Sequence, residues 1–241
     1  MAIRPVFVVD EGKDSLIKEK NIEFNFHNGM AISQKQKSIR SLHEAAKDAG
    51  IENILEVSTK SETELGNRLS AFNLSYFSNQ MNKRISLEAA FQGSKVFEAD
   101  GPHTDLYTKE PFEIKKDERI SREKKIIGFE FEGIKWQTEP KTAFYDWIYL
   151  KAVKSNIEEL NDPIYEEIIN YKAFTDIEFN PKKSINCQAR SCALYVSLAK
   201  KELLDIALEN EEAFLDILSK DSFYRIEKKD DSSQGEFNLD I

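Results

Sequence analysis

The sequence predicts an α+β fold that is rich in helices and contains a small sheet, and three observations lead to this prediction. Several runs have the apolar spacing of amphipathic helices, and a few shorter runs have the alternation of strands. The two kinds of run do not follow each other in the regular order of a parallel α/β sheet. Hydrophobic residues make up 40% of the 241 residues, which is ample for a core. We expect one domain over residues 1–227 and a disordered polar tail over residues 228–241.

The first part of the chain is expected to form two strands, a helix and a third strand. A turn signal at residues 27–29 follows the second strand. Residues 33–36 have the spacing of a capping box, and the apolar residues after them indicate a helix that closes at Gly50. The predicted strands cover residues 4–9, 22–26 and 51–57.

The middle of the chain is expected to contain a loop, a helix, an exposed segment and a hairpin. Residues 65–77 mix apolar and small polar residues without a helical period, which suits a loop that lines a site. Ser86 can cap a helix over residues 87–97. Charged residues dominate the segment 109–125, and residues 126–136 alternate like the strands of a hairpin.

The last part of the chain is expected to be mainly helical. Asp162 and Pro163 mark a helix start, because Asp can cap a helix and Pro fits its first turn. One strand is expected over residues 174–179. The other predicted helices cover residues 142–154, 188–208 and 210–219.

Composition and charge exclude several classes of protein. The net charge of −9 argues against non-specific binding to long nucleic acid, but it does not exclude a small basic pocket for one nucleotide. The start of the chain lacks a signal-peptide pattern and no apolar run is long enough to span a membrane, so we expect a cytoplasmic protein. The two cysteines and three histidines share no metal-ligand spacing, so neither a metal nor another cofactor is expected.

Glu88, Gln92 and Lys95 are the most informative residues. At about 100° per residue they fall on one face of the helix predicted over residues 87–97. They are either a solvated face with weak contacts or a catalytic acid/base beside a nucleophilic amine. Spacing alone favours the solvated face. Phe91 and the Gly-Pro turn after the helix, where backbone could approach a ligand, favour a site.

A second group of polar residues lies in the segment 174–190, between a predicted strand end and a predicted helix start. Because a helix N-terminus attracts anions, Lys182, Lys183 and Arg190 are candidates to bind phosphate. Asn186 and Gln188 are candidates to read a base edge or a ribose. The alternative is a polar connection that only caps the next helix, but the mixture of acids, amides and basic groups favours a site.

Two further groups carry weaker signals. Ser70, Phe72 and Asn73 lie in the predicted loop and are candidates to line a pocket. The aromatic and acidic residues of the segment 129–146 are interpreted more simply as core and as the start of a helix.

The helix at residues 88–95 resembles the signature of the NADAR family, the YbiA-like proteins. That signature is a Glu, then aromatic residues and Phe-Gln, then a Lys seven positions after the Glu. The matching residues here are Glu88, Phe91, Gln92 and Lys95. Residues 178–181 look like the family's second acidic segment, and residues 69–74 look like the loop before the Glu/Lys helix. Much of residues 24–200 is similar to a narrower branch, the NADAR antitoxins paired with DarT-type ADP-ribosyltransferase toxins.

The resemblance implies an ADP-ribosyl hydrolase that removes ADP-ribose from guanine in DNA and so acts as antitoxin to its partner toxin. Lys95 would attack the anomeric carbon and Glu88 would be its acid/base partner. The implied substrate-binding residues are Gln92, Phe91, Ser70, Phe72, Asn73, Glu178, Asn180, Lys183, Asn186, Gln188 and Arg190. The alternative is a module without activity, which binds ADP-ribose or related nucleotides or inhibits the toxin directly.

The sequence departs from the family pattern in two places. Ala89 stands where the family often has His directly after the Glu. Lys183, Asn186 and Cys187 stand where YbiA-like proteins have an Asp and a Trp-Gly pair. The basic and amide groups at these positions would suit a larger nucleic-acid adduct.

Overall fold

The computed structural model describes residues 1–12, 15–114, 116–120, 124–160, 162–221 and 224. Within these residues the fold is α+β and rich in helices, as predicted, and its strands form sheets of four, two and three strands. The tail predicted over residues 228–241 lies outside the described residues. In the part of the chain that the structure describes, no helix has the length and apolar character needed to cross a membrane.

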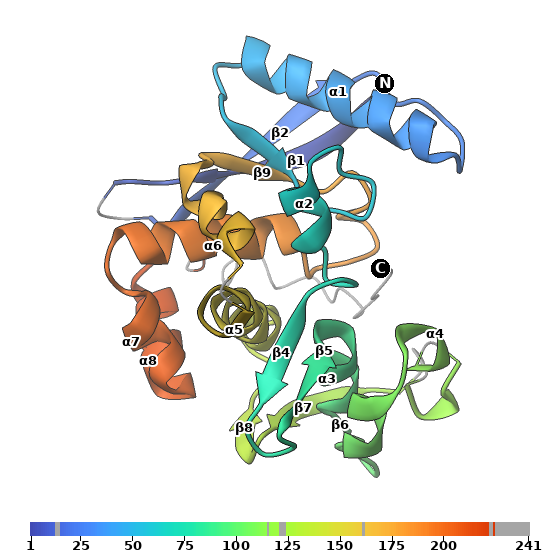
Figure 1. The fold of residues 1–241 in the computed structure, drawn as a ribbon, viewed down its shortest axis with the longest axis vertical. Coiled ribbons are helices and arrows are strands. Elements are labelled where there is room, and N and C mark those ends of the chain that lie inside the picture. The colour runs from blue at the N-terminus through green and yellow to red at the C-terminus, as the bar shows by residue number, and fades with distance from the viewer. Residues whose placement is uncertain (13–14, 115, 121–123, 161, 222–223, 225–241) are drawn as a thin grey trace.

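The four-stranded sheet brings the first strands of the chain together with the last one. Its members, in spatial order, are β2 (Ile17–Phe24), β1 (Ala2–Val9), β9 (Ala173–Thr175) and β3 (Ile54–Glu56). β9 pairs antiparallel with β1 and parallel with β3, so a late strand lies between two early ones. Helix α1 (Ile32–Asp48) covers one face of this sheet, and α6 (Gln188–Lys200) lies on the other (Figure 1).

β1 is apolar on both faces, because its successive residues point into two different cores. Val6 packs in the smaller core under α1, together with Ile39 and Leu42. Phe7 and Val9 point to the larger core, which contains α6. The sheet is therefore buried on both faces. A site can open at the end of the sheet where β1 begins.

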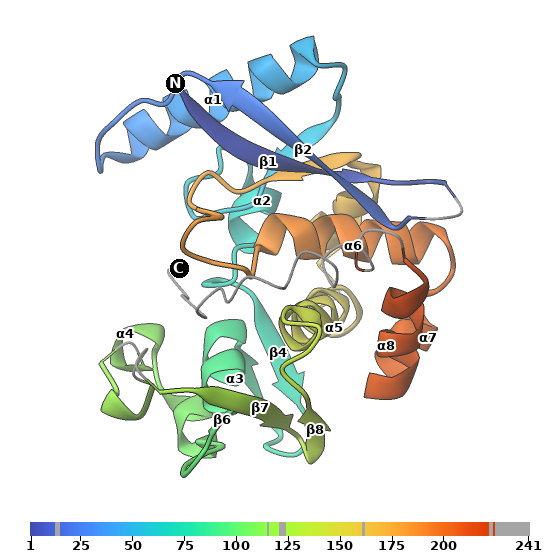
Figure 2. The same ribbon diagram turned by 180° about the vertical axis from the view of Figure 1, so that it is seen from behind.

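The remaining strands form a second layer on the far side of α5 (Ala143–Leu160). Figure 2 shows α5 between α6 and this layer, and almost all residues in the first half of α5 are buried. The strands are β4 (Ser75–Ser78), β5 (Lys83–Ser86), β6 (Lys95–Phe97), β7 (Ile126–Phe131) and β8 (Ile134–Trp136). The predicted hairpin is confirmed as β7 and β8. Helix α3 (Leu87–Gly93) follows β5 directly and packs against α5.

Several predicted boundaries differ from the structure. The predicted capping box is wrong, since α1 begins after Ala31 without a side-chain cap. The loop predicted over residues 65–77 contains α2 (Glu64–Arg68), which Thr63 caps by accepting a hydrogen bond from Gly66 N. The predicted helix over 188–208 is divided into α6 and α7 (Leu204–Glu209), followed by α8 (Glu211–Lys220). The other short elements are α4 (Pro111–Ile114) and the 3-10 turns Thr104–Thr108, Glu118–Ile120 and Pro163–Asn170.

Candidate functional site

The acid and the amide singled out from the sequence lie in a buried helix. α3 begins after Ser86, whose Oγ accepts a hydrogen bond from Ala89 N at 3.1 Å, as the sequence predicted. Glu88 and Gln92 are 3% and 8% exposed. Gln92 Nε2 donates a hydrogen bond to Glu88 Oε1 at 2.9 Å. A solvated helix face is therefore the wrong interpretation, and the carboxylate is held by a neighbour one turn away.

Lys95 is buried beside them, but on a strand. The prediction that one helix carries all three residues is wrong, because α3 ends at Gly93 and Lys95 is the first residue of β6, opposite Phe129 of β7. The pairing with β7 draws the backbone out of the helix. The Lys95 side chain is 5% exposed, and its Nζ lies 5.3 Å from the centroid of the Phe91 ring. This distance is typical of a cation–π contact.

Phe91 lies in an aromatic core. Its ring is 1% exposed and lies 5.6 Å from Phe129, 6.0 Å from Phe144 and 5.3 Å from Tyr145, measured between centroids. The ring therefore supports Lys95 on one side and Tyr145 on another. A direct contact between Phe91 and a substrate stays a prediction.

A cavity of about 430 Å³ lies where the end of β9 meets the loop after α2. It brings together two segments that the sequence analysis had marked, although they lie more than a hundred residues apart. The predicted residues that line it are Ser70, Phe72, Glu178, Asn180, Lys183, Asn186 and Gln188. Gln188 joins the two segments, because its Oε1 accepts a hydrogen bond from Ala71 N at 2.8 Å and its Nε2 donates one to Asp176 Oδ2 at 2.9 Å.

Three residues that line this cavity carry buried polar atoms without partners in the described part of the chain. Ser70 Oγ, Asn186 Oδ1 and Arg4 Nε are buried and make no hydrogen bond to the described residues. Most buried polar atoms in folded proteins have a partner. Three such atoms around one cavity therefore indicate a place for a polar ligand.

Tyr145 contacts both the cavity and the aromatic core of α3. It lines the cavity, and its ring meets that of Phe91 edge to face. Burial, and next the charge of Glu88, raise the pKa of Tyr145 well above its usual value, so its hydroxyl stays protonated. Glu88, Gln92 and Lys95 themselves are not among the described residues that line the cavity. Tyr145 thus relates the proposed catalytic group to the proposed binding residues.

Asp176 and Glu56 form a buried acidic pair at the cavity. The Asp176 carboxylate lines the cavity and accepts hydrogen bonds from the side chain of Gln188 and from the backbone N of Glu178 and Phe179. Burial raises the pKa of Asp176 to about 7. Burial, and next the charge of Asp176, raise the pKa of Glu56 to about 8. Burial therefore favours the protonated form of both carboxyl groups at this cavity.

Besides the residues of α3 and β6, two of the substrate-binding residues implied by the family resemblance do not line the cavity. Asn73 is exposed, and its Nδ2 donates hydrogen bonds to the backbone and side-chain oxygens of Asn67 at 2.9 Å. Arg190 is 4% exposed and forms an ion pair with the buried Asp146 at 3.1 Å. The structure therefore shows a structural contact for each residue, and the contact of each with substrate stays a prediction. Asn73 holds the turn after α2, and Arg190 neutralises a buried acid.

Six residues that line the cavity were missed, namely Arg4, Lys35, Tyr145, Asp176, Ile177 and Phe179. Asp176 and Tyr145 lie inside segments that the sequence analysis had noted. Asp176 was not named as a site residue, and Tyr145 was interpreted as a core residue. Arg4 and Lys35 carry no local signal, because they come from a strand and a helix whose patterns indicate only burial. Only the pairing of β1 with β9 brings them to the cavity.

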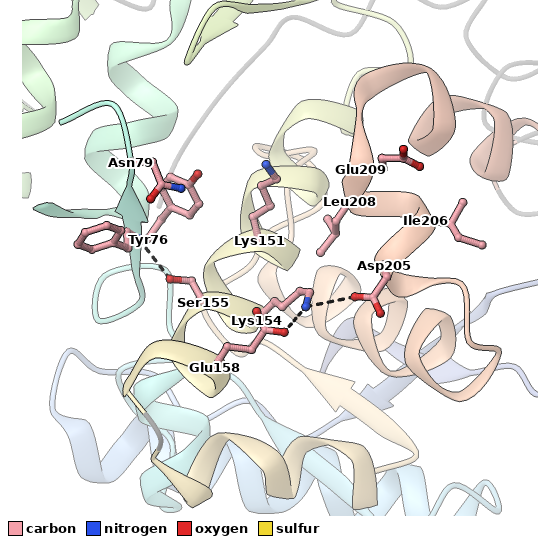
Figure 3. Close-up of a pocket in the computed structure, with 11 residues that line it drawn as sticks. Tyr76, Asn79, Lys151, Lys154, Ser155, Glu158, Asp205, Ile206, Leu208 and Glu209 are labelled. Atoms are coloured by element: carbon pink, nitrogen blue, oxygen red, sulfur yellow. Dashed lines mark hydrogen bonds and ion pairs between the residues drawn. The ribbon is translucent and has the colours of Figure 1, made fainter. Parts of the chain in front are cut away.

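Another cavity, of about 510 Å³, lies between β4, α5 and α7 (Figure 3). Lys151 and Lys154 extend from α5 at this cavity, and Lys154 forms ion pairs with Glu158 and Asp205 (Figure 3). Tyr76 and Phe77, at the end of the segment predicted to line a site, are among its lining residues, but none of the predicted catalytic or substrate-binding residues is. The cavity at β9 is therefore the better candidate site.

A family model described as DarT1-associated NADAR antitoxin matches residues 2–228. The match includes α3, β6 and every residue named above for the cavity. The comparison with curated proteins finds no match.

Proposed function

The chain belongs to the DarT1-associated NADAR antitoxin family, and from this premise we propose that it is an N-glycosyl hydrolase that removes ADP-ribose from guanine bases in DNA. The products are unmodified guanine and ADP-ribose. This activity reverses the modification made by a DarT-type ADP-ribosyltransferase, and the protein thereby acts as the antitoxin of such a toxin.

One observation carries the proposal: an acid and an amide on α3 and an amine at the start of β6 are all buried around Phe91, whose ring contacts Tyr145 at the cavity. Glu88, Gln92 and Lys95 are each less than 9% exposed, which is rare for such side chains unless they are paired or functional. Taking a carboxylate and an amine out of water costs free energy. A role in chemistry explains why this cost is tolerated.

The proposed reaction has two stages. A proton first passes from Nζ of Lys95 to the Glu88 carboxylate. The free amine then attacks the anomeric carbon of the modified ribose, the bond from this carbon to the guanine amino nitrogen breaks, and Glu88 gives its proton to the leaving amino group. Glu88 next takes a proton from the nitrogen of the new bond and gives it to the ring oxygen, as the sugar ring opens to a protonated Schiff base. Water adds to the Schiff-base carbon, Glu88 moves the proton of this water to the lysine nitrogen, and the carbon–nitrogen bond breaks, which releases ADP-ribose and restores the amine.

The test is the release of ADP-ribose from an oligonucleotide with one ADP-ribosylated guanine, followed by chromatography. We expect Lys95→Ala to lower the rate at least 100-fold, because it removes the nucleophile. Lys135→Ala is the matched control, since Lys135 is an exposed lysine on the same three-stranded sheet. Reduction of the Schiff base during turnover should leave the sugar covalently attached to Lys95, and peptide mass spectrometry would detect this product. Wild-type turnover by Lys95→Ala would refute the catalytic proposal.

A second function, binding without chemistry, is favoured by the separation between the cavity and Lys95. Three residues that line the cavity carry atoms that lack partners within the described residues, so a nucleotide could bind there without the amine. A Lys95→Ala protein that loses turnover but still protects cells from the toxin would support direct inhibition. Loss of both would support the hydrolase.

A further inference from the structure

Arg4 and Lys35 place two cations at one end of the cavity, and the proposed chemistry uses neither. Arg4 lies on β1 and Lys35 lies in the first turns of α1, which packs over β1 and β2 in both ribbon views (Figures 1 and 2). The guanidinium carbon of Arg4 is 5.9 Å from the centroid of the Phe26 ring, and Nζ of Lys35 is 5.7 Å from it. One aromatic ring thus positions both cations.

These two cations are not neutralised within the described residues, where neither forms an ion pair with a carboxylate. The protein has a net charge of −9, yet the acidic residues at this cavity already have partners. Glu178 lies 3.9 Å from Lys60, and the carboxylate of Asp176 accepts three hydrogen bonds from its own segment and from Gln188.

Arg4 also has an unused donor. Its Nη1 donates a hydrogen bond to the backbone O of Ile3 at 3.0 Å, whereas its buried Nε has no partner. Burial lowers the pKa of Arg4, and the charge of Asp176 opposes this effect. A half-buried guanidinium with a free donor is stabilised when an anion binds to it.

We infer that Arg4 and Lys35 bind a phosphate group of the substrate at the end of the cavity formed by β1 and α1. This inference rests on the proposed function and deepens it. Arginine offers a planar fork of donors and lysine a mobile point charge, a combination that suits phosphate oxygens. The phosphate belongs either to the diphosphate of ADP-ribose or to the DNA backbone beside the modified guanine.

Calorimetric binding separates the two sources, with free ADP-ribose and an unmodified single-stranded oligonucleotide as probes. If the diphosphate is bound, Arg4→Gln and Lys35→Gln should each weaken ADP-ribose binding about tenfold, as expected for one charge-assisted hydrogen bond, and leave oligonucleotide binding unchanged. If the DNA backbone is bound, the same variants should weaken only oligonucleotide binding and reduce its salt dependence by about one ion for each cation removed.

Lys37→Gln is the matched control, because Lys37 lies on α1 two residues from Lys35 but is exposed and does not line the cavity. Arg4→Lys, which keeps the charge and the fold but not the fork, should weaken binding less than Arg4→Gln. Wild-type affinity of both Gln variants for both probes would overturn the inference, as would a wild-type protein that binds neither probe. Because the readout is binding, this result does not depend on whether Lys95→Ala abolishes turnover.

Discussion

Gln92 donates a hydrogen bond of 2.9 Å to Glu88 inside a helix that is buried along its whole length. The two residues come from successive turns of α3, so the backbone itself fixes the geometry of the pair. The oxygen of the Gln92 amide has no partner among the described residues. The proposal that Gln92 binds a sugar hydroxyl of the substrate would supply one.

Gln92→Met should lower kcat about 10- to 100-fold, because a hydrogen bond to a charged group contributes about 1.5–3 kcal/mol. Met has nearly the same length, so the core around α3 should keep its packing. Steady-state kinetics on the modified oligonucleotide measure the effect, with thermal unfolding as the control for the fold. An increase in KM with unchanged kcat would show that Gln92 acts only in binding.

Gly101→Ala should reduce both stability and activity. A Cβ at this position would lie 2.4 Å from the backbone O of Lys95, and the backbone here has a φ of +97°. Strain of this kind costs about 1–3 kcal/mol, and relief of the clash would displace Lys95. Gly133→Ala is the matched control, since Gly133 has a φ of +81° and nothing within 4 Å. Urea unfolding should show the larger loss for Gly101→Ala, and equal losses would mean that the contact with Lys95 is unimportant.

Arg190→Met should destabilise the protein without weakening substrate binding by the molecules that remain folded. It would leave the fully buried carboxylate of Asp146 without its cation, which typically costs about 3–5 kcal/mol. Lys182→Ala, an exposed substitution in the neighbouring loop, should change stability by less than about 0.5 kcal/mol. Urea unfolding and KM are the two measurements. A raised KM at unchanged stability would support a contact between Arg190 and substrate.

Glu56→Gln should flatten the pH dependence of stability. The pKa of Glu56 is raised to about 8 in the folded protein, so the folded state keeps a proton that the unfolded state releases near pH 4.5. Stability should then fall as pH rises from about 5 to 8, by up to about 1.4 kcal/mol per pH unit for one proton. Gln keeps an oxygen to accept from Ser58 Oγ and Ile177 N. Thermal unfolding at several pH values measures the slope. An identical slope in Glu56→Gln and wild type would assign the titration to another group.

Sequence patterns predicted those features of the fold that depend on residues close together in the chain. The cap at Ser86 fixed the start of α3, and the polar segment 174–190 contains much of one wall of the cavity. The capping box at residues 33–36 failed because its spacing also occurs within the first turns of a helix.

Long-range pairing decided the rest. Lys95 leaves the helix because β7, more than thirty residues further on, pairs with β6. Arg4 and Lys35 reach the cavity only because β9 pairs with β1. No periodicity within a short window contains this information. The choice of Glu88 and Lys95 as catalytic residues rests on the family resemblance and stays a prediction.

Because β9 lies between β1 and β3, the sheet cannot form, and the protein cannot act, until most of the chain has been synthesised. Residues 173–175 must have left the ribosome before the sheet can close, and residues 176–188 before the cavity has its second wall. At about 5–20 residues per second, synthesis to this point takes roughly 10–35 s. Prematurely ended chains would lack the cavity altogether. Protection of a cell therefore depends on nearly complete synthesis of each copy, and a pause in translation would leave a partner toxin unopposed.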